Sequence, residues 1–332
     1  MTCNRQRRLA LQAVSSTVLL GSGVRSVPAQ AQRSSWPERA VQLEVPYTPG
    51  TTADTLSRSL GAKLADRWKV AVVTDNRAGA SGIIGTEFAA KAPPDGYTLL
   101  FTATSHGTVP ALHPKLNFDP LRSFAPVVLL ATSALAVVVS PSLPVSTLRE
   151  FIDLARKDPG KLAYSSPGTG APQHLTMELF MLETGTQLLH VPYKGSSGAL
   201  TDLVGGQVQA SIVSLQTAGT FVKSGKLRML AVMSEERSPA FPDVPKVKEL
   251  GLPKLVVETW YGVFAPAGTP GDILMRVNQD LNALLQRPDV REDLAKQGLT
   301  AAGGTPERLG GLLQEELARW SRVVSSAHIK AE

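Results

Sequence analysis

Beyond its N-terminal segment, this sequence has no cysteine. The single cysteine among 332 residues is Cys3, which lies before an apolar run near the N-terminus. A chain that loses this segment forms no disulfide, has no thiol nucleophile and offers no cysteine to a metal. The lack of cysteine suits the bacterial periplasm, where accidental disulfides are a hazard.

Basic runs interleaved with aromatic residues are also missing, and aromatic residues make up 5% of the chain. The formal charge of +6 comes largely from Arg5, Arg7, Arg8 and Arg25, because residues 1–31 contain no acid. Without that segment, 30 basic residues face 28 acidic ones, a net charge of +2. We therefore predict no nucleic-acid partner.

The N-terminus has the pattern of a secretory signal peptide. Arginines precede a modestly apolar run, and Ala29-Gln30-Ala31 supplies the small residues of a cleavage site after Ala31. The run is too short for a stable anchor, so we expect a periplasmic protein without a membrane span in the mature chain. Arg7-Arg8 leaves Sec export and twin-arginine export both open.

Polar loops between expected strands and expected helices are the main feature of the remaining chain. In the first, Pro49-Gly50 makes a turn, and Thr51, Thr52 and Asp54 open a helix with leucines at four-residue spacing. The first N–H groups of a helix lack internal partners and carry partial positive charge, so such a loop can hold an anion. An ordinary N-cap turn is the alternative for one loop taken alone.

Three further loops repeat this arrangement. Residues 102–107 follow a strand at 97–101, the glycine-rich residues 166–172 lead into a helix from Pro172, and residues 192–198 follow another strand. In open α/β sheets such loops share the edge where ligands bind. We expect a small-ligand site where they face each other across a hinge.

Strands alternating with helices predict an α/β fold with mainly parallel sheets. We expect a strand at 70–74, ended by Asp75-Asn76, and two consecutive strands within the apolar run 124–139. That run is the predicted first crossing between two domains, and a long strand at 256–265 is the return crossing. Three helices close the chain, near 270–286, 289–297 and 306–325.

These crossings predict a discontinuous first domain, residues 32–132 plus 255–332. The second domain is residues 133–254. The ligand cleft lies between the two.

Five segments resemble the Bug-type extracytoplasmic solute-binding proteins of tripartite tricarboxylate transporters in Gram-negative bacteria. They follow in the matching order and cover nearly the whole mature chain: VPYTPGTTADTLSR (45–58), TDNRAGASGIIGTEFAAKAPPDGYTLL (74–100), LAYSSPGTGAPQHL (162–175), HVPYKGSSGALTDLVGGQV (190–208) and ETWYGVFAPAGTP (258–270). The resemblance implies a two-domain periplasmic-binding-protein ("Venus flytrap") fold, type II-like, with the ligand between the lobes.

The resemblance also implies a function and a site. It implies a monomeric receptor, without enzymatic activity or cofactor, that captures a di- or tricarboxylate, an amino acid or an aromatic carboxylate and delivers it to membrane permease subunits. Loop N–H groups, hydroxyls and waters hold the carboxylate more than an arginine clamp does. The implied ligand contacts are Tyr47, Thr48, Thr51, Thr52, Asp54, Thr104, Ser105, Ser166, Gly168, Thr169, Gly170, Tyr193 and Lys194.

Two departures from the family bear on the ligand. Thr51-Thr52-Ala53 stands where the family commonly has glycines, which narrows the cleft and adds hydroxyls. Gln209 and Ala210 stand where the family often has an aspartate, so a ligand amino group loses a partner there.

Several residues admit two interpretations. Asp54 either caps its helix or binds a ligand amino group, Lys194 either pairs with an anion or is solvated, and His174 either caps and packs or bonds a carboxylate. Arg77 is expected in a structural salt bridge. The histidines show no metal-site spacing, so we predict no metal.

A periplasmic hydrolase using a serine of the Ser165-Ser166 or Ser196-Ser197 pairs is the competing function, although neither pair has a nucleophile-elbow motif. A ligand-sensing partner of a sensor kinase is a further alternative. The residues do not name the ligand.

Overall fold

The structure, a computed structural model, describes residues 36–329. The predicted signal peptide and its cleavage site after Ala31 lie outside this range. Among the described residues, no helix is long and apolar enough to cross a membrane.

Ten strands form one sheet, in the order β2-β1-β3-β9-β4-β7-β5-β6, with β8 and β10 also paired to β4. The strands are β1 (Val41–Val45), β2 (Val72–Asn76), β3 (Thr98–Ala103), β4 (Phe124–Val139), β5 (Ala163–Ser166), β6 (Leu189–Pro192), β7 (Ala210–Ser214), β8 (Arg228–Val232), β9 (Glu258–Pro266) and β10 (Thr300–Ala301).

The prediction of mainly parallel sheets is wrong for the middle of this sheet. β1 pairs in parallel with β2 and β3, and β5 pairs in parallel with β6 and β7. All pairings of β4, and that of β3 with β9, are antiparallel. The sheet is therefore mixed, because the two crossing strands run between two parallel sets.

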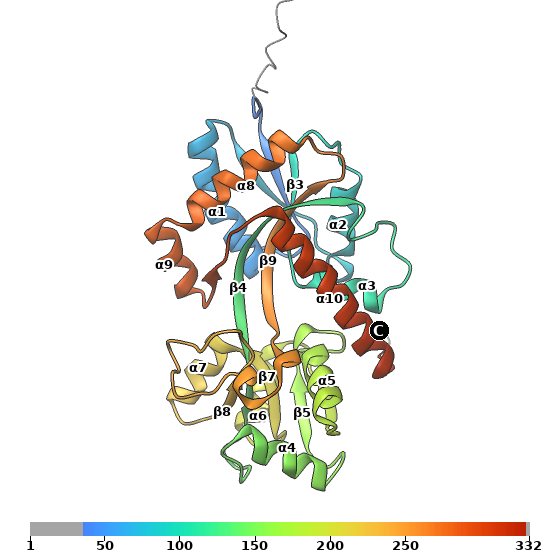
Figure 1. The fold of residues 1–332 in the computed structure, drawn as a ribbon, viewed down its shortest axis with the longest axis vertical. Coiled ribbons are helices and arrows are strands. Elements are labelled where there is room, and N and C mark those ends of the chain that lie inside the picture. Colours follow the sequence, from blue (N-terminus) through green and yellow to red (C-terminus); the bar gives the residue numbers. More distant parts are fainter. Residues whose placement is uncertain (1–35, 330–332) are drawn as a thin grey trace, which may run out of the picture. The chain divides into compact units, whose positions relative to one another are not determined.

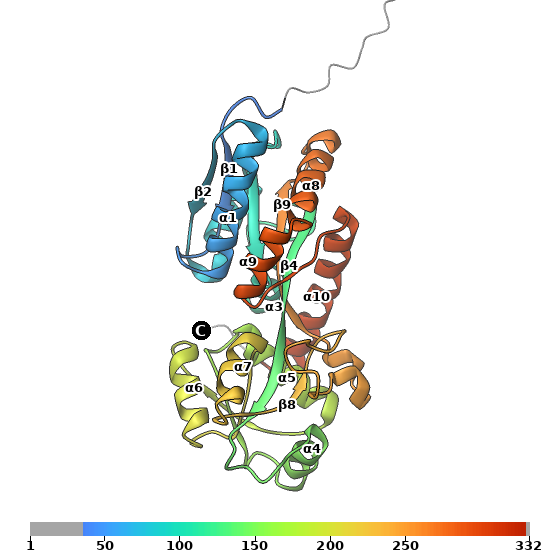
Figure 2. The ribbon, with the colours of Figure 1, turned by 90° about the vertical axis from the view of Figure 1, so that its left-hand side faces the viewer.

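The apolar run 124–139 forms one strand of 16 residues rather than the two that we predicted. β4 pairs with β9 from Phe124 to Ala134 and with β7 from Leu135 onward, so its partners change along its length. Register shifts near Val128 and Ala131 let it bend without a break. Figures 1 and 2 show β4 and β9 side by side.

β2 also differs from the prediction, since Asp75 and Asn76 lie inside it. They pair with Glu44 and Val45 of β1. Gln42 and Arg77 both donate to Asp75, which stabilises a carboxylate within the strand.

The helices follow the strands as expected, with one addition. They are α1 (Thr52–Trp68), α2 (Ile83–Ala90), α3 (Ser105–Leu112), α4 (Leu148–Lys157), α5 (Pro172–Thr184), α6 (Ser196–Val204), α7 (Leu215–Lys223), α8 (Gly271–Leu285), α9 (Pro288–Lys296) and α10 (Pro306–Ser326), with short 3-10 turns at Ala80–Gly82, Val247–Leu250 and Pro253–Leu255. The addition is α3, which begins inside the predicted loop 102–107 and extends beyond it to Leu112.

The buried side chains group into clusters on each half of the sheet. One half is packed by residues of 36–131 and 260–313, including Leu43, Phe101 and Val277. The other is packed by residues of 134–257 together with Trp320 and its neighbours on α10. The last helix thus contributes to both cores.

Candidate functional site

A cavity of about 430 Å³ lies between α3 and the glycine-rich loop that joins β5 to α5. Its lining comes from α3 and the residue after it, from the loop, and from the 3-10 turn before α2: Ser105, Thr108, Val109, Leu112, His113, Pro167, Gly168, Thr169, Gly170, Ala171, Pro172, Ala80 and Ser81. None of these residues carries a permanent charge, and His113 is the only one with a titratable side chain.

α3 presents one face to this cavity. Ser105, Thr108, Val109 and Leu112 are spaced as i, i+3, i+4 and i+7, which places them along one stripe of the helix. The stripe changes from hydroxyls at the N-terminal end to apolar side chains at the C-terminal end. A ligand along it meets polar groups first and hydrocarbon next.

The glycine-rich loop forms the facing wall, and Gly170 is a position in it that requires glycine. It has φ +78°, and a Cβ added there would lie 2.8 Å from Leu112 Cδ1. The loop is held from behind by the segment after β6, because Tyr193 N donates to Ser166 O and Gly195 N donates to Pro167 O.

Buried side chains fix the two ends of this loop. The Ser166 hydroxyl lies 2.7 Å from His190 Nε2 and accepts a hydrogen bond from Gly168 N. His174, which is 4% exposed, accepts from Gly170 N through Nδ1 at 3.0 Å. The two imidazole rings stack with their centroids 4.0 Å apart.

Glu178, whose side chain is 16% exposed, lies beside these two histidines. Its Oε1 accepts from the Tyr164 hydroxyl at 2.6 Å and lies 3.5 Å from His174 Nε2. Burial raises the pKa of Glu178, but hydrogen bonds from His174 and Tyr164 outweigh it and leave this pKa below its ordinary value. Burial and the neighbouring carboxylate raise the pKa of Tyr164.

Tyr47 reaches the cavity through Ser105. Its hydroxyl lies 2.5 Å from Ser105 Oγ and 2.9 Å from Thr102 Oγ1, and it accepts from Ala103 N. Burial raises the pKa of Tyr47. This network fixes the start of α3.

The rest of the first loop does not line this cavity. Thr51 is the N-cap of α1, and its hydroxyl accepts from Asp54 N. Asp54, in the first turn of α1, accepts from Gly50 N and pairs with Arg58, so its carboxylate is held within the first loop and its helix. Thr48 is exposed and bonds Thr51 through its carbonyl, while the Thr52 side chain bonds Tyr261.

Three other predicted residues have partners or positions away from the cavity. Thr104 is buried, and its hydroxyl accepts from Trp260 N at 2.8 Å. The Tyr193 hydroxyl donates to Asp202, and burial and this carboxylate raise the pKa of Tyr193 to about 12. Lys194 is exposed.

The cavity therefore brings together Ser105, Gly168, Thr169 and Gly170 of the predicted set, with Tyr47 and Ser166 directly behind them. Whether each predicted residue touches a ligand stays a prediction. Arg77 forms the expected structural salt bridges, with Glu44 and Asp75.

Sequence reasoning missed most of the α3 face and the turn before α2. The spacing of Thr108, Val109 and Leu112 was a usable signal for a helix face. Ala80 and Ser81 have φ of +46° and +57°, left-handed values that are uncommon without glycine. Strained backbone of this kind is concentrated at functional sites. No sequence pattern predicts the left-handed conformation of Ala80 and Ser81.

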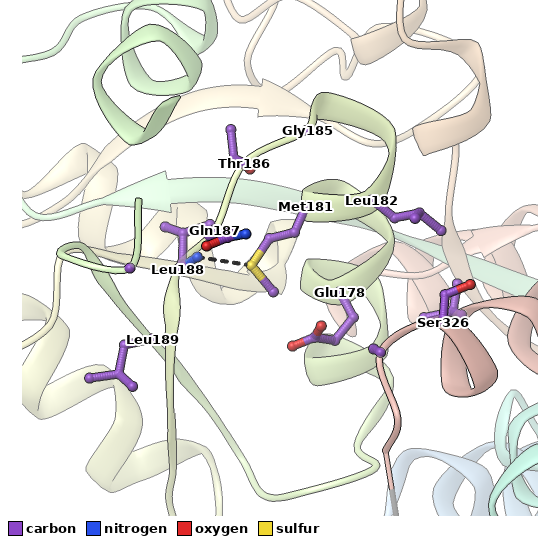
Figure 3. A pocket seen from close by; sticks show the side chains of 12 residues that line it. Glu178, Met181, Leu182, Gly185, Thr186, Gln187, Leu188, Leu189 and Ser326 are labelled. Carbon is purple, nitrogen blue, oxygen red and sulfur yellow. Dashed lines mark hydrogen bonds between the residues drawn. The ribbon is translucent and has the colours of Figure 1, made fainter. Parts of the chain in front are cut away.

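A second cavity, of about 690 Å³, lies beside α5 and the end of α10 (Figure 3). Figure 3 shows Glu178 and Met181 projecting from α5 and Leu189 on the opposite side of the space. Its lining includes the Glu178 carboxylate, which would repel an anion, and contains none of the predicted contacts. We therefore take the smaller cavity, which is lined by Ser105, Gly168, Thr169 and Gly170 of the predicted set, as the candidate site.

The described residues contain no group of three or more His, Cys, Asp or Glu side chains arranged to hold a metal ion. The chemistry available at the candidate site is hydrogen bonding from hydroxyls, with hydrocarbon contact from α3.

Comparisons with known proteins agree on one family. Residues 56–329 match the model of the tripartite tricarboxylate transporter family receptor. Protein BugT of Bordetella pertussis is 37% identical over 306 residues, which are 92% of this chain and 94% of BugT.

Two solved structures from Rhodopseudomonas palustris are also similar. Rpa4515 with adipate is 35% identical, with a TM-score of 0.73 over 89% of this chain and 99% of that one. MatC with bound malate is 32% identical, with a TM-score of 0.70 over 87% and 99%. This likeness confirms the predicted periplasmic-binding-protein fold. The chain belongs to the receptor family of the tripartite tricarboxylate transporters, whose members are periplasmic solute-binding proteins.

Proposed function

We propose that this receptor captures a small organic acid in the cavity between α3 and the glycine-rich loop. The observation that carries the proposal is the lining itself, which places hydroxyl groups at a site without permanent charge. An anion in such a site is held by aimed dipoles rather than by an ion pair. Its hydrocarbon part packs on Val109 and Leu112.

The ligand class follows from the same lining and from the relatives. Rpa4515 and MatC are described with adipate and malate, both dicarboxylates. We extend this class to the present chain. His113, at the end of the α3 stripe, supports it by offering an imidazole to a second carboxylate.

We further propose a monomer of two domains, residues 32–132 plus 255–332 and residues 133–254, exported by cleavage after Ala31. The change of β4 partners between Ala134 and Leu135 supports the first crossing. The acid binds the closed state of the two domains better than the open state, so it shifts the population toward the closed state. This closed state presents the surface that membrane permease subunits bind. The receptor carries out no chemistry on the ligand.

A thermal-shift screen of residues 32–332 against adipate, malate, citrate, benzoate and amino acids tests this function. An acid at about 100 times its dissociation constant adds about 2.7 kcal/mol, which raises the melting temperature by several degrees. We expect a shift with a dicarboxylate and an unchanged ligand after long incubation. A folded protein that responds to no carboxylate, or that converts one, would contradict the proposal.

A further inference from the structure

The buried His174 and the partly exposed Glu178 form a pair directly behind the glycine-rich loop. We propose that this pair is a positioning device, which fixes the direction of the Gly170 N–H and makes binding of an anionic ligand depend on His174 being neutral. The inference rests on the proposed function and adds a regulation to the same site.

The hydrogen bonds define the protonation state of His174. Gly170 N donates to Nδ1 at 3.0 Å, so Nδ1 must offer a lone pair. The proton of a neutral ring then lies on Nε2, which faces Glu178 Oε1 at 3.5 Å. Tyr164 donates to the same oxygen at 2.6 Å, as expected for an ionised carboxylate. A line of hydrogen bonds thus runs from Glu178 through His174 to the loop.

Protonation of His174 on Nδ1 breaks its hydrogen bond with Gly170 N. A proton on Nδ1 faces the Gly170 N–H, so two donors meet and Gly170 must turn away. Gly170 has φ +78° and lies against Leu112 on the facing wall of the cavity. A displacement of Gly170 therefore changes the cavity itself.

The positive charge that protonation adds to His174 does not compensate for the lost hydrogen bond with Gly170. Glu178 lies beside His174 and neutralises most of the positive charge that an anion would otherwise feel. The geometric effect therefore prevails, and we expect weaker binding of an anion at low pH.

Two other titratable groups face His174 from neighbouring strands. Tyr164 of β5 lies with its ring nearly parallel to that of His174, and His190 of β6 stacks on it at 4.0 Å. His190 reaches Ser166 Oγ through Nε2, and a protonated His190 can still donate to this hydroxyl. Protonation of His174 thus disturbs the loop. Protonation of His190 leaves its hydrogen bond with the Ser166 hydroxyl intact.

Substitutions at His174 separate these effects. His174→Gln places an amide oxygen that can accept from Gly170 N, without a titrating group, whereas His174→Leu has no acceptor. Adipate affinity is measured by calorimetry at about pH 8 and about pH 5.5. We expect wild-type affinity to fall about three- to tenfold at the lower pH, the effect of one lost hydrogen bond.

His174→Gln is expected to keep wild-type affinity at about pH 8 and to show only the change that comes from adipate's own protonation. His174→Leu is expected to bind weakly at both pH values while remaining folded by thermal denaturation. A wild-type pH profile that coincides with that of His174→Gln would overturn the proposal.

A ligand-free measurement keeps the result independent of the proposed function. In nuclear magnetic resonance spectra of residues 32–332, the Gly170 amide signal should shift with the titration of the His174 ring nitrogens, and stay constant in His174→Gln. A Gly170 signal that ignores the titration of His174 would overturn the inference even if adipate binds. A Gly170 amide signal that follows the titration of His174, in a protein that does not bind adipate, would support the positioning role of His174. It would contradict the proposed ligand class.

Discussion

Glu44 is a fully buried carboxyl group on β1, and its Oε1 atom has no hydrogen-bond partner. Its other oxygen accepts from Arg77 and Gln42. Gly85 of α2 permits this burial, because a Cβ there would lie 2.9 Å from Oε1. Burial raises the pKa of Glu44 to about 7, with Arg77 opposing the shift.

This pKa predicts a pH-dependent stability. The unfolded chain releases the Glu44 proton near the ordinary pKa of 4.5, and the folded chain releases it near 7. Glu44 therefore contributes stability that is complete below about pH 4.5 and is lost as the pH rises through about 7. The total change is about 3 kcal/mol in the free energy of unfolding.

Glu44→Gln removes this titration while keeping a polar side chain. The free energy of unfolding is measured with urea at about pH 5 and about pH 8. From the lower to the higher pH, this free energy should rise by about 2 to 3 kcal/mol in the variant relative to wild type. Equal pH dependence in both proteins would mean that Glu44 titrates normally.

At the scale of elements, the site depends on the close approach of α3 to the glycine-rich loop. Gly170→Ala places a methyl group against Leu112 and a side chain at φ +78°. Gly225→Ala is a matched control, because Gly225 has φ +70° and nothing within 4 Å of an added Cβ. Both variants should lose roughly 1 kcal/mol of stability from the left-handed backbone.

Adipate affinity should then fall in Gly170→Ala alone, by about tenfold or more, since a displaced Leu112 changes the cavity wall. Calorimetry of the two variants measures this difference. Equal affinities would show that the approach of Leu112 to Gly170 does not shape the site.

The loops and the elements differ in how well the sequence predicts them. Pro172 and the leucines behind it identify the start of α5, and local glycine and proline signals place the loop before it. Asp54 was ambiguous because a capping carboxylate and a ligand-binding one have the same sequence context. The α3 face and the His174–Gly170 bond depend on tertiary contacts between segments, which no local pattern records.

At the scale of the whole molecule, β4, β9 and α10 connect the two halves of the sheet. Alternation of strands and helices predicted the α/β class, and the resemblance predicted the fold. The antiparallel pairing of β3 and β4 with β9 was not predictable from local sequence, because a continuous apolar run carries no sign of its partner's direction.

The proposed two-domain arrangement predicts closure on binding. X-ray scattering of residues 32–332 should give a monomer whose radius of gyration decreases when adipate is added at saturation. An unchanged radius, with binding established by calorimetry, would mean that the receptor binds without closing.

The most direct test of the account is a calorimetric titration of adipate into wild type and Thr169→Trp. Thr169 lines the cavity, so an indole there should fill the space and abolish binding while the melting temperature stays near that of wild type. Loss of binding in a folded variant would establish the cavity between α3 and the glycine-rich loop as the ligand site. Unchanged affinity in Thr169→Trp would contradict that claim.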